Sequence, residues 1–359
     1  MVHNTSVPNA YDATRYRPDV DGLRAVAVLS VLANHIGIPL FSGGYVGVDI
    51  FFVISGFLII NQIATHVAAG PFSFGAFWAR RTLRILPPYL LVIAASAVIA
   101  SYVLAAQEEF DDFTRQVRYS ALMLVNHLFL RQQGYFDADA DFKPLLHLWS
   151  LAVEEQFYIV APIALVALAW LWRGSSITRH VAIGAVVLIT ALSFALCVSL
   201  SGGSDDKNYA FYLMPLRMWE FVAGGAIALA APYAARLPRR ALEALGFAGA
   251  ALIAISVVAF DDKTRFPGVA VSIPVLGACL LILVGMSHRG THVSGMLSTP
   301  LMVGIGLISY SWYLWHWPLL VFGRIYNLGD RDLAFDALLG GGLSLVLAIG
   351  TYRLVEKPI

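Results

Sequence analysis

Ten long apolar runs constrain the fold of this chain more than any other feature of its sequence. A helix that crosses the hydrocarbon core of a bilayer needs about 20 predominantly apolar residues. We therefore predict an all-α fold, a polytopic membrane bundle of about ten transmembrane helices, in which 1–359 form a single integral membrane domain with a polar N-terminal tail at 1–18. The runs lie at 22–41, 44–64, 85–106, 147–172, 180–201, 213–232, 243–260, 268–286, 300–323 and 333–353.

The composition of the chain fits this class and excludes others. Of the 359 residues, 58% are apolar and 13% are charged, whereas a soluble domain averages about 45–50% and about 25%. So little polar surface excludes a soluble enzyme, a disordered chain and a protein that binds nucleic acid. Cys197 and Cys279 each lie inside an apolar run, so we expect neither a disulfide framework nor a metal site.

The segment 107–146 decides the topology. Its candidate span at 113–130 contains Arg115 and Arg118, and its purely apolar part is too short to cross. With this segment on one side and the N-terminus in the cytoplasm, the cytoplasmic segments hold 14 of the 24 basic residues and 5 of the 23 acidic ones. This bias follows the positive-inside rule and predicts ten spans with both termini in the cytoplasm.

Ionisable residues inside spans are costly, which makes them candidates for function. Arg24 and His35 are eleven residues apart in the first run, so they lie on one helical face, about 16 Å apart along the axis. One interpretation makes Arg24 a topology anchor and His35 an interhelical hydrogen-bonding residue. The other interpretation makes both residues functional.

An arginine cluster precedes the third run. Arg80 and Arg84 are four residues apart and share a helical face, and Arg81 lies about 100° round. Two interpretations stay open: a basic interfacial helix that anchors to anionic lipid, and a guanidinium cluster that binds phosphates.

The fourth run opens with a polar stripe. His147, Ser150, Glu154 and Tyr158 fall on one helical face, and Glu155 follows Glu154 directly. Two adjacent carboxylates near the end of a span need cations, a watery cavity or protonation. A structural network with arginine is the alternative to a functional site.

Three other spans also contain polar groups. Arg217 is followed by Glu220, His316 lies among tryptophans, and Asp49 is flanked by glycines, which indicate close helix packing or a tight turn. Together the polar residues suggest two poles, and hence a phosphate-bearing cytoplasmic donor with an acceptor on the far side. The inner pole is Arg24, Arg80, Arg81, Arg84 and Glu356; the outer pole is His35, His147, Glu154, Arg217 and His316.

These motifs resemble the membrane-bound acyltransferase-3 family, in the order that the family shows. The resemblance runs from Tyr16 to the last residue. It rests on the Arg-x10-His spacing of Arg24 and His35, the glycine-rich segment 43–57, the arginine helix before the third run, and the segments 147–155, 217–220, 313–318 and 355–358.

The resemblance implies an O-acyltransferase of the bacterial inner membrane. Such an enzyme takes an acyl group, usually acetyl, from cytoplasmic acyl-CoA and places it on a hydroxyl of an extracytoplasmic glycan or lipid-linked glycan. The opening segment 16–25 is similar to the subgroup that modifies lipopolysaccharide O-antigen. Members of that subgroup often carry an extracytoplasmic domain of the Ser-Gly-Asn-His hydrolase type, so this chain is either a stand-alone member or part of a longer protein.

The polar poles and the resemblance together assign roles to particular residues. His35 is the candidate base, because imidazole is the natural base near neutral pH, and Arg24 guides the donor. Arg80, Arg81 and Arg84 hold the phosphates of acetyl-CoA, the expected cosubstrate. His147, Glu154 and His316 are candidates for orienting the base, binding the sugar or serving as the acid, and the candidates for substrate binding are Asp49, Arg217, Trp149 and Trp315.

The sequence leaves the chemical route open. Neither a Gly-x-Ser-x-Gly motif nor a reactive cysteine supports a serine or cysteine acyl-enzyme, but direct attack by the sugar and a transient acyl-histidine both remain. Two other classes compete. One is a haem protein with histidines of three spans as axial ligands; the other is a transporter or flippase of a polysaccharide precursor that uses the same polar cavity.

Overall fold

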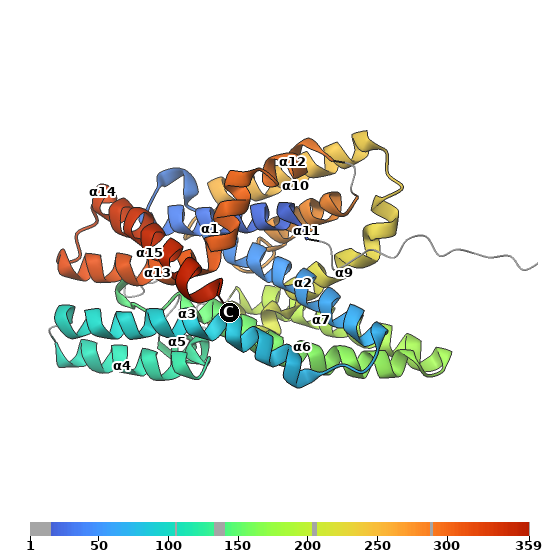
Figure 1. The fold of residues 1–359 in the computed structure, drawn as a ribbon, viewed down its shortest axis with the longest axis horizontal. Helices are drawn as coiled ribbons and strands as arrows, with labels where there is room; N and C mark the ends of the chain where they lie inside the picture. The colour runs from blue at the N-terminus through green and yellow to red at the C-terminus, as the bar shows by residue number, and fades with distance from the viewer. Residues whose placement is uncertain (1–15, 105, 133–140, 203–206, 288–289, 359) are drawn as a thin grey trace, which may run out of the picture.

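The computed structural model describes residues 16–104, 106–132, 141–202, 207–287 and 290–358. Within these residues the fold is entirely helical and contains no strand (Figure 1). The predicted class, a polytopic bundle of helices, is confirmed. Most of the polar tail predicted for 1–18 lies outside the described residues.

Each of the ten predicted apolar runs corresponds to a helix or to a continuous helical segment. The last one, Leu333–Glu356, consists of α14 (Leu333–Asp336), α15 (Ser344–Thr351) and two π-helical segments. The other nine are α1 (Pro18–Ile36), α2 (Gly47–Ala69), α3 (Phe74–Val103), α6 (Leu148–Trp172), α7 (Ser176–Leu200), α9 (Met214–Ala234), α10 (Arg239–Ala259), α11 (Ser272–Met286) and α13 (Pro300–Tyr326).

By length and composition, 6 of these helices could cross a membrane: α2, α3, α6, α7, α10 and the C-terminal segment. α11 is apolar but only 15 residues long. The remaining three, α1, α9 and α13, carry four residues of the predicted poles: Arg24, His35, Arg217 and His316. These polar residues are largely buried by neighbouring helices, which is how a bilayer protein tolerates them.

The segment 107–146 does not form one long helix. Its described residues contain two short helices, α4 (Gln107–Ala121) and α5 (Val125–Gln132), and α4 packs against α3. The turn between them places Met123 in the left-handed region, with φ of 54°. Neither helix reaches the length of a span, in agreement with the prediction that 113–130 does not cross.

The connections between the long helices gather at two ends of the molecule (Figure 1). The α1–α2 and α13–α14 connections lie at the left end, together with the turn from α3 to α4. The α6–α7 and α9–α10 connections lie at the right end. Segments that the ten-span topology predicts on opposite sides are therefore at opposite ends.

Helix α1 lies at the centre of the site because it packs against both α13 and α2. Glycines allow α2 to approach its neighbours closely. A Cβ on Gly47 would lie 2.3 Å from the carbonyl oxygen of Ala27 in α1, and a Cβ on Gly56 would lie 1.9 Å from that of Phe221 in α9. These contacts confirm the close packing predicted from the glycines around Asp49.

Candidate active site

A cavity of about 120 Å³ opens between α1, α2, α3, α6 and α13. It brings together arginines of two helices and adjacent glutamates of a third. Its polar lining consists of Arg24, Arg81, Arg84, Glu154, Glu155, Tyr158, Ser55, Ser150, Ser309, Tyr310 and Tyr313. Three residues of the predicted inner pole, Arg24, Arg81 and Arg84, therefore line one cavity, whereas Arg80 and Glu356 do not line it.

The three arginines of the cavity differ in their bonding partners and in their exposure to solvent. Arg24 donates from Nη1 to Asp21 Oδ1 at 3.3 Å. Arg81 donates from Nη2 to Gln62 at 2.5 Å, and its guanidinium carbon lies 5.8 Å from the centroid of the Tyr158 ring. Arg84 lines the same cavity but is an exposed residue.

Arg80 does not line the cavity and is exposed. The pair that lines the cavity is Arg81 and Arg84, which are three residues apart. The sequence spacing had suggested Arg80 and Arg84 instead. The reason is the orientation of α3, which directs Trp78 to the Tyr158 carbonyl, at 3.1 Å. No observation tests the role predicted for Arg80 in donor binding, and its place outside the cavity favours Arg81 and Arg84 as the donor-binding pair.

Glu154 belongs to the arginine cavity and not to the group of histidines with which its sequence pattern placed it. It accepts hydrogen bonds from the hydroxyls of Ser55 and Tyr158. On α6 it lies seven residues beyond His147, roughly 10 Å along the axis. The polar stripe of α6 therefore connects the two groups instead of belonging to one.

Three histidines from three different segments meet beyond the cavity. His35 Nδ1 lies 2.9 Å from His316 Nε2, and the two rings are nearly parallel. The ring of His147, at the start of α6, has its centroid 5.7 Å from that of His316, and its Nε2 donates to the Leu314 carbonyl at 3.1 Å. All three side chains are buried.

The hydrogen bonds of these rings determine where their protons lie. His316 Nδ1 lies 2.6 Å from the Tyr313 carbonyl, which only accepts, so a neutral His316 donates there and accepts at Nε2. His35 Nδ1 must then donate to His316. A neutral His35 carries its basic lone pair on Nε2, the atom suited to take a proton from a substrate.

Tyr313 separates the arginine cavity from the histidines. It lines the cavity, and its hydroxyl lies 2.8 Å from Ser150 Oγ and donates to the His147 carbonyl at 3.0 Å. Its ring centroid is 5.3 Å from that of His316. His35 does not line the cavity, so Tyr313 and His316 connect the cavity to His35.

A second hollow, of about 460 Å³, lies between α4, the segment 142–144 and the end of α13. None of the three histidines lines it, but Trp317 contacts both regions: its ring centroid lies 4.5 Å from that of His35 and its Nε1 donates to the Lys143 carbonyl at 2.9 Å. Lys143 lines the hollow, with acidic, amide and aromatic side chains of α4 around it: Glu108, Glu109, Asp112, Phe113 and Gln116.

Asp49 and Arg217 form a separate buried network. Arg217 pairs with Asp49 and, through Nε, with Glu220 at 3.1 Å. Its guanidinium carbon lies 5.6 Å from the centroid of Phe52, whose side chain lines the arginine cavity. Neither Asp49 nor Arg217 lines the cavity, so the structure places them behind its wall; their role in substrate binding stays a prediction.

The two tryptophans predicted to bind substrate also lie away from the cavity. Trp149 packs on Phe211, with ring centroids 4.5 Å apart. Trp315 donates from Nε1 to Thr351 Oγ1 in α15 at 2.9 Å. Within the described residues, no group of three or more histidines, cysteines and carboxylates could hold a metal ion.

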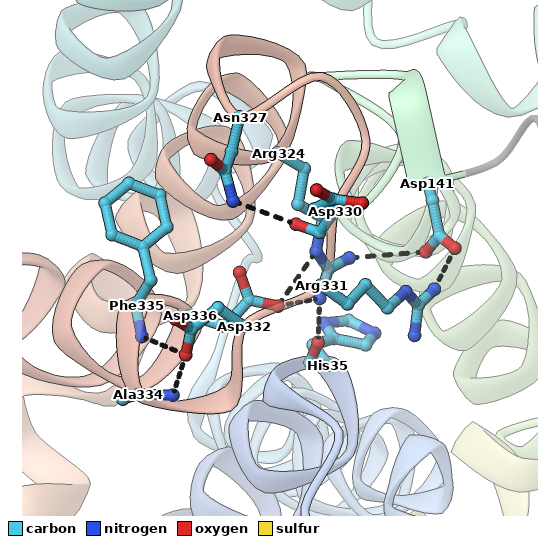
Figure 2. Close-up of polar contacts among 10 residues, drawn as sticks. All are labelled: His35, Asp141, Arg324, Asn327, Asp330, Arg331, Asp332, Ala334, Phe335 and Asp336. Atoms are coloured by element: carbon cyan, nitrogen blue, oxygen red, sulfur yellow. Dashed lines mark hydrogen bonds and ion pairs between the residues drawn. The ribbon is translucent and has the colours of Figure 1, made fainter.

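Sequence reasoning missed Arg324. It is 2% exposed and contacts the backbone of His35 (Figure 2). The available signal was an arginine directly after the apolar run 300–323, followed by Asp336 inside the next run. Ionisable residues at such positions are functional candidates in the same way as Arg24.

The fold and the site define a class: a polytopic helical membrane protein in which an arginine-lined cavity adjoins a buried acid/base cluster. The chain belongs to the acyltransferase-3 family, whose model, described as an acyltransferase domain, matches residues 17–353. This match confirms the family that the sequence motifs suggested.

Curated relatives from three bacteria are similar over almost the whole chain. “Putative peptidoglycan O-acetyltransferase YrhL” of Bacillus subtilis is 31% identical over 96% of this chain and 55% of its own length. “Peptidoglycan O-acetyltransferase OatA” of Listeria monocytogenes is 29% identical over 96% and 56%, and a “Putative O-acetyltransferase” of Staphylococcus aureus is 27% identical over 97% and 58%. The chain thus spans a little over half the length of these relatives. No solved structure matches it.

Proposed function

We propose that this acyltransferase moves an acetyl group from cytoplasmic acetyl-CoA to a hydroxyl of an extracytoplasmic glycan. The observation that carries the proposal is the placement of His35. Its ring is oriented by His316, and short chains of contacts connect it to two sites: through His316 and Tyr313 to the arginine cavity, and through Trp317 and Lys143 to the polar hollow. The names of the relatives support acetyl as the acyl group and oxygen as the acceptor atom.

The donor would bind with its phosphates at Arg24, Arg81 and Arg84. Guanidinium groups bind phosphates through paired, charge-assisted hydrogen bonds. The cavity volume of about 120 Å³ is below the roughly 300–1,000 Å³ of a site that encloses a whole drug-sized ligand. We therefore place the nucleotide at the arginine mouth, with only the pantetheine arm extending inward toward Tyr313.

The proposed reaction uses His35 as a general base. Its Nε2 takes the proton of the sugar hydroxyl while the hydroxyl oxygen bonds to the thioester carbonyl carbon. The carbon–sulfur bond then breaks, and the CoA thiolate leaves and receives a proton. A route through a transient acyl-histidine has the same overall balance, so both routes remain within the proposal.

The acceptor would enter from the second hollow. The carboxylates and the amide that line the hollow can hydrogen-bond to a sugar, and its aromatic rings can stack on one. The relatives named for peptidoglycan make that glycan one candidate acceptor, and the motif at 16–25 makes lipopolysaccharide O-antigen another.

In this proposal the chain lies in the inner membrane of a bacterium, with both termini in the cytoplasm. A domain of the Ser-Gly-Asn-His type, in the same protein or in a separate one, is a further partner.

Turnover by the purified protein in lipid tests the proposal. We expect radiolabelled acetyl to pass from acetyl-CoA to muropeptide or O-antigen oligosaccharide with release of one CoA thiol per ester formed. The variant His35→Ala should release thiol at least about 10²-fold more slowly. A transporter or flippase, the competing function of the same cavity, would move the glycan without consuming acetyl-CoA, and glycan movement without CoA release would refute the proposal.

A further inference from the structure

A buried ion cluster joins the outer ends of α1 and α13 (Figure 2). Arg324, at the end of α13, donates from Nε and Nη2 to Asp336 Oδ2 at 3.0 and 2.8 Å and from Nη1 to Asp141 Oδ1 at 3.3 Å. Its Nη2 also donates to the backbone carbonyl of His35 at 2.6 Å. One guanidinium therefore joins three segments that are far apart in the sequence.

The carbonyl that Arg324 binds belongs to the last turn of α1. The final four carbonyls of a helix have no partner within the helix. α1 ends at Gly37, whose left-handed φ of 93° turns the chain away, so no further turn provides a donor to His35. Arg324 provides a charge-assisted bond at that point, and its positive charge is favourable at a helix C-terminus.

Helix α13 thus contacts His35 at two points, the ring and the backbone carbonyl. His316 bonds to the ring at 2.9 Å, and Arg324, about two turns further on, bonds to the backbone of the same residue at 2.6 Å. The first contact determines the proton position and the second determines where the end of α1 lies. We propose that Arg324 is a positioning residue that keeps the His35 ring aligned with His316 during acyl transfer, an inference that rests on the proposed function.

The surroundings of Arg324 hold it in place for this role. Asp332 caps α14 by accepting from the backbone N–H of Ala334 at 2.8 Å, and this orders the turn that carries Asp336. Asp336 is as buried as Arg324, and Asp141 is shared with the exposed Arg331. Two arginines face two aspartates, so the cluster is balanced in charge.

Substitution of Arg324 separates positioning from simple ion pairing. Arg324→Lys keeps a cation beside Asp336 but lacks the planar fork that reaches two acceptors at once. Arg331→Ala is the matched control, because Arg331 is 57% exposed and bonds Asp141. Acetyl-CoA turnover, thermal stability in detergent, and the rate at which diethylpyrocarbonate modifies His35, followed by mass spectrometry, are measured for each protein.

We expect kcat to fall about 10²-fold in Arg324→Lys, since a displacement of about 1 Å in a reacting group costs about that much. KM for acetyl-CoA should stay within about threefold, because the cavity arginines are untouched. Modification of His35 should become faster, and Arg331→Ala should behave as wild type. Arg324→Lys with wild-type kcat, or an equal loss in Arg331→Ala, would overturn the proposal.

Two further measurements keep the test decisive. If Arg324→Lys fails to fold, the charge-balanced double variant Arg324→Gln with Asp336→Asn replaces it, and wild-type kcat there would again refute positioning. If the wild-type protein does not consume acetyl-CoA, the proposed function fails by itself. The modification rate of His35 then decides the positioning role independently, and an unchanged rate in the Arg324 variant counts against it.

Discussion

The neighbouring arginines of α3 offer a sharp test of donor binding. Arg84 lines the cavity, whereas Arg80 does not line it and is exposed. Arg84→Ala should therefore weaken CoA binding, and Arg80→Ala should leave it unchanged. Arg84 is a cleaner choice than Arg81, because Arg81 also bonds Gln62 and stacks over aromatic rings, so its loss would disturb the fold.

The size of the effect follows from the contact and its exposure. A hydrogen bond to a charged group contributes about 1.5–3 kcal/mol, and about 1.4 kcal/mol corresponds to a factor of ten in affinity. Since Arg84 is exposed to solvent and its charge is screened, we expect the low end, an increase in Kd of about tenfold. The loss should shrink at high salt.

A thermal-shift or calorimetric titration of the purified variants with CoA measures this difference. Dephospho-CoA provides a second ligand with one phosphate fewer, and its affinity should fall less in Arg84→Ala if the 3′-phosphate is the group bound. Equal affinities for CoA in wild type and Arg84→Ala would refute the reasoning. Unchanged affinity in both variants would make the helix a lipid anchor instead of a nucleotide site, and an equal loss in both would show that lining the cavity does not decide which arginine binds CoA.

Three further predictions concern the route from the cavity to the histidines. His35→Ala should lower acetyl transfer at least about 10²–10⁴-fold, the usual contribution of general base catalysis, with unchanged elution on gel filtration; activity within a few fold of wild type would remove His35 from the mechanism. His316→Gln should retain more activity than His316→Leu, because the glutamine carbonyl can still accept from His35 Nδ1; equal kcat values would contradict the assigned tautomer. Tyr313→Ala should raise the rate of acetyl-CoA hydrolysis in the absence of acceptor, because it removes the side chain that lies between the cavity and the histidines. Thiol release measures this rate, and an unchanged rate would show that Tyr313 is no barrier.

Much of the fold was accessible from hydrophobicity alone. Apolar length predicted every long helix of the bundle, because in a bilayer backbone hydrogen bonds must close within each segment. The rejection of 113–130 as a span agrees with the break at Met123. Helix ends such as that of α1 were less well predicted, since Gly37 ends the helix inside the apolar run 22–41.

The site was only partly predictable, because sequence spacing orders residues along one helix but does not say which helices meet. The spacing correctly placed Arg24 and His35 on one helix, and the structure adds that they contact different neighbours, the cavity and His316. Glu154 was grouped with the wrong pole for the same reason. Arg324 was missed because its partner carbonyl belongs to a segment 289 residues away in sequence.

The proposed entry of donor and acceptor from opposite sides depends on which side of the membrane each connection of the bundle faces. The α4 helix and the α9–α10 connection should lie on opposite sides of the membrane, given the acidic first turn of α4 and the basic segment 236–240. A cysteine at exposed Glu108 should react with an impermeant maleimide added to intact cells, and one at exposed Arg240 should react only after the cells are opened. The native Cys197 is buried and should stay unlabelled in both experiments. Labelling of both introduced cysteines in intact cells would place the arginine cavity and the second hollow on the same side, and a donor from the cytoplasm could then not reach His35 by the proposed path.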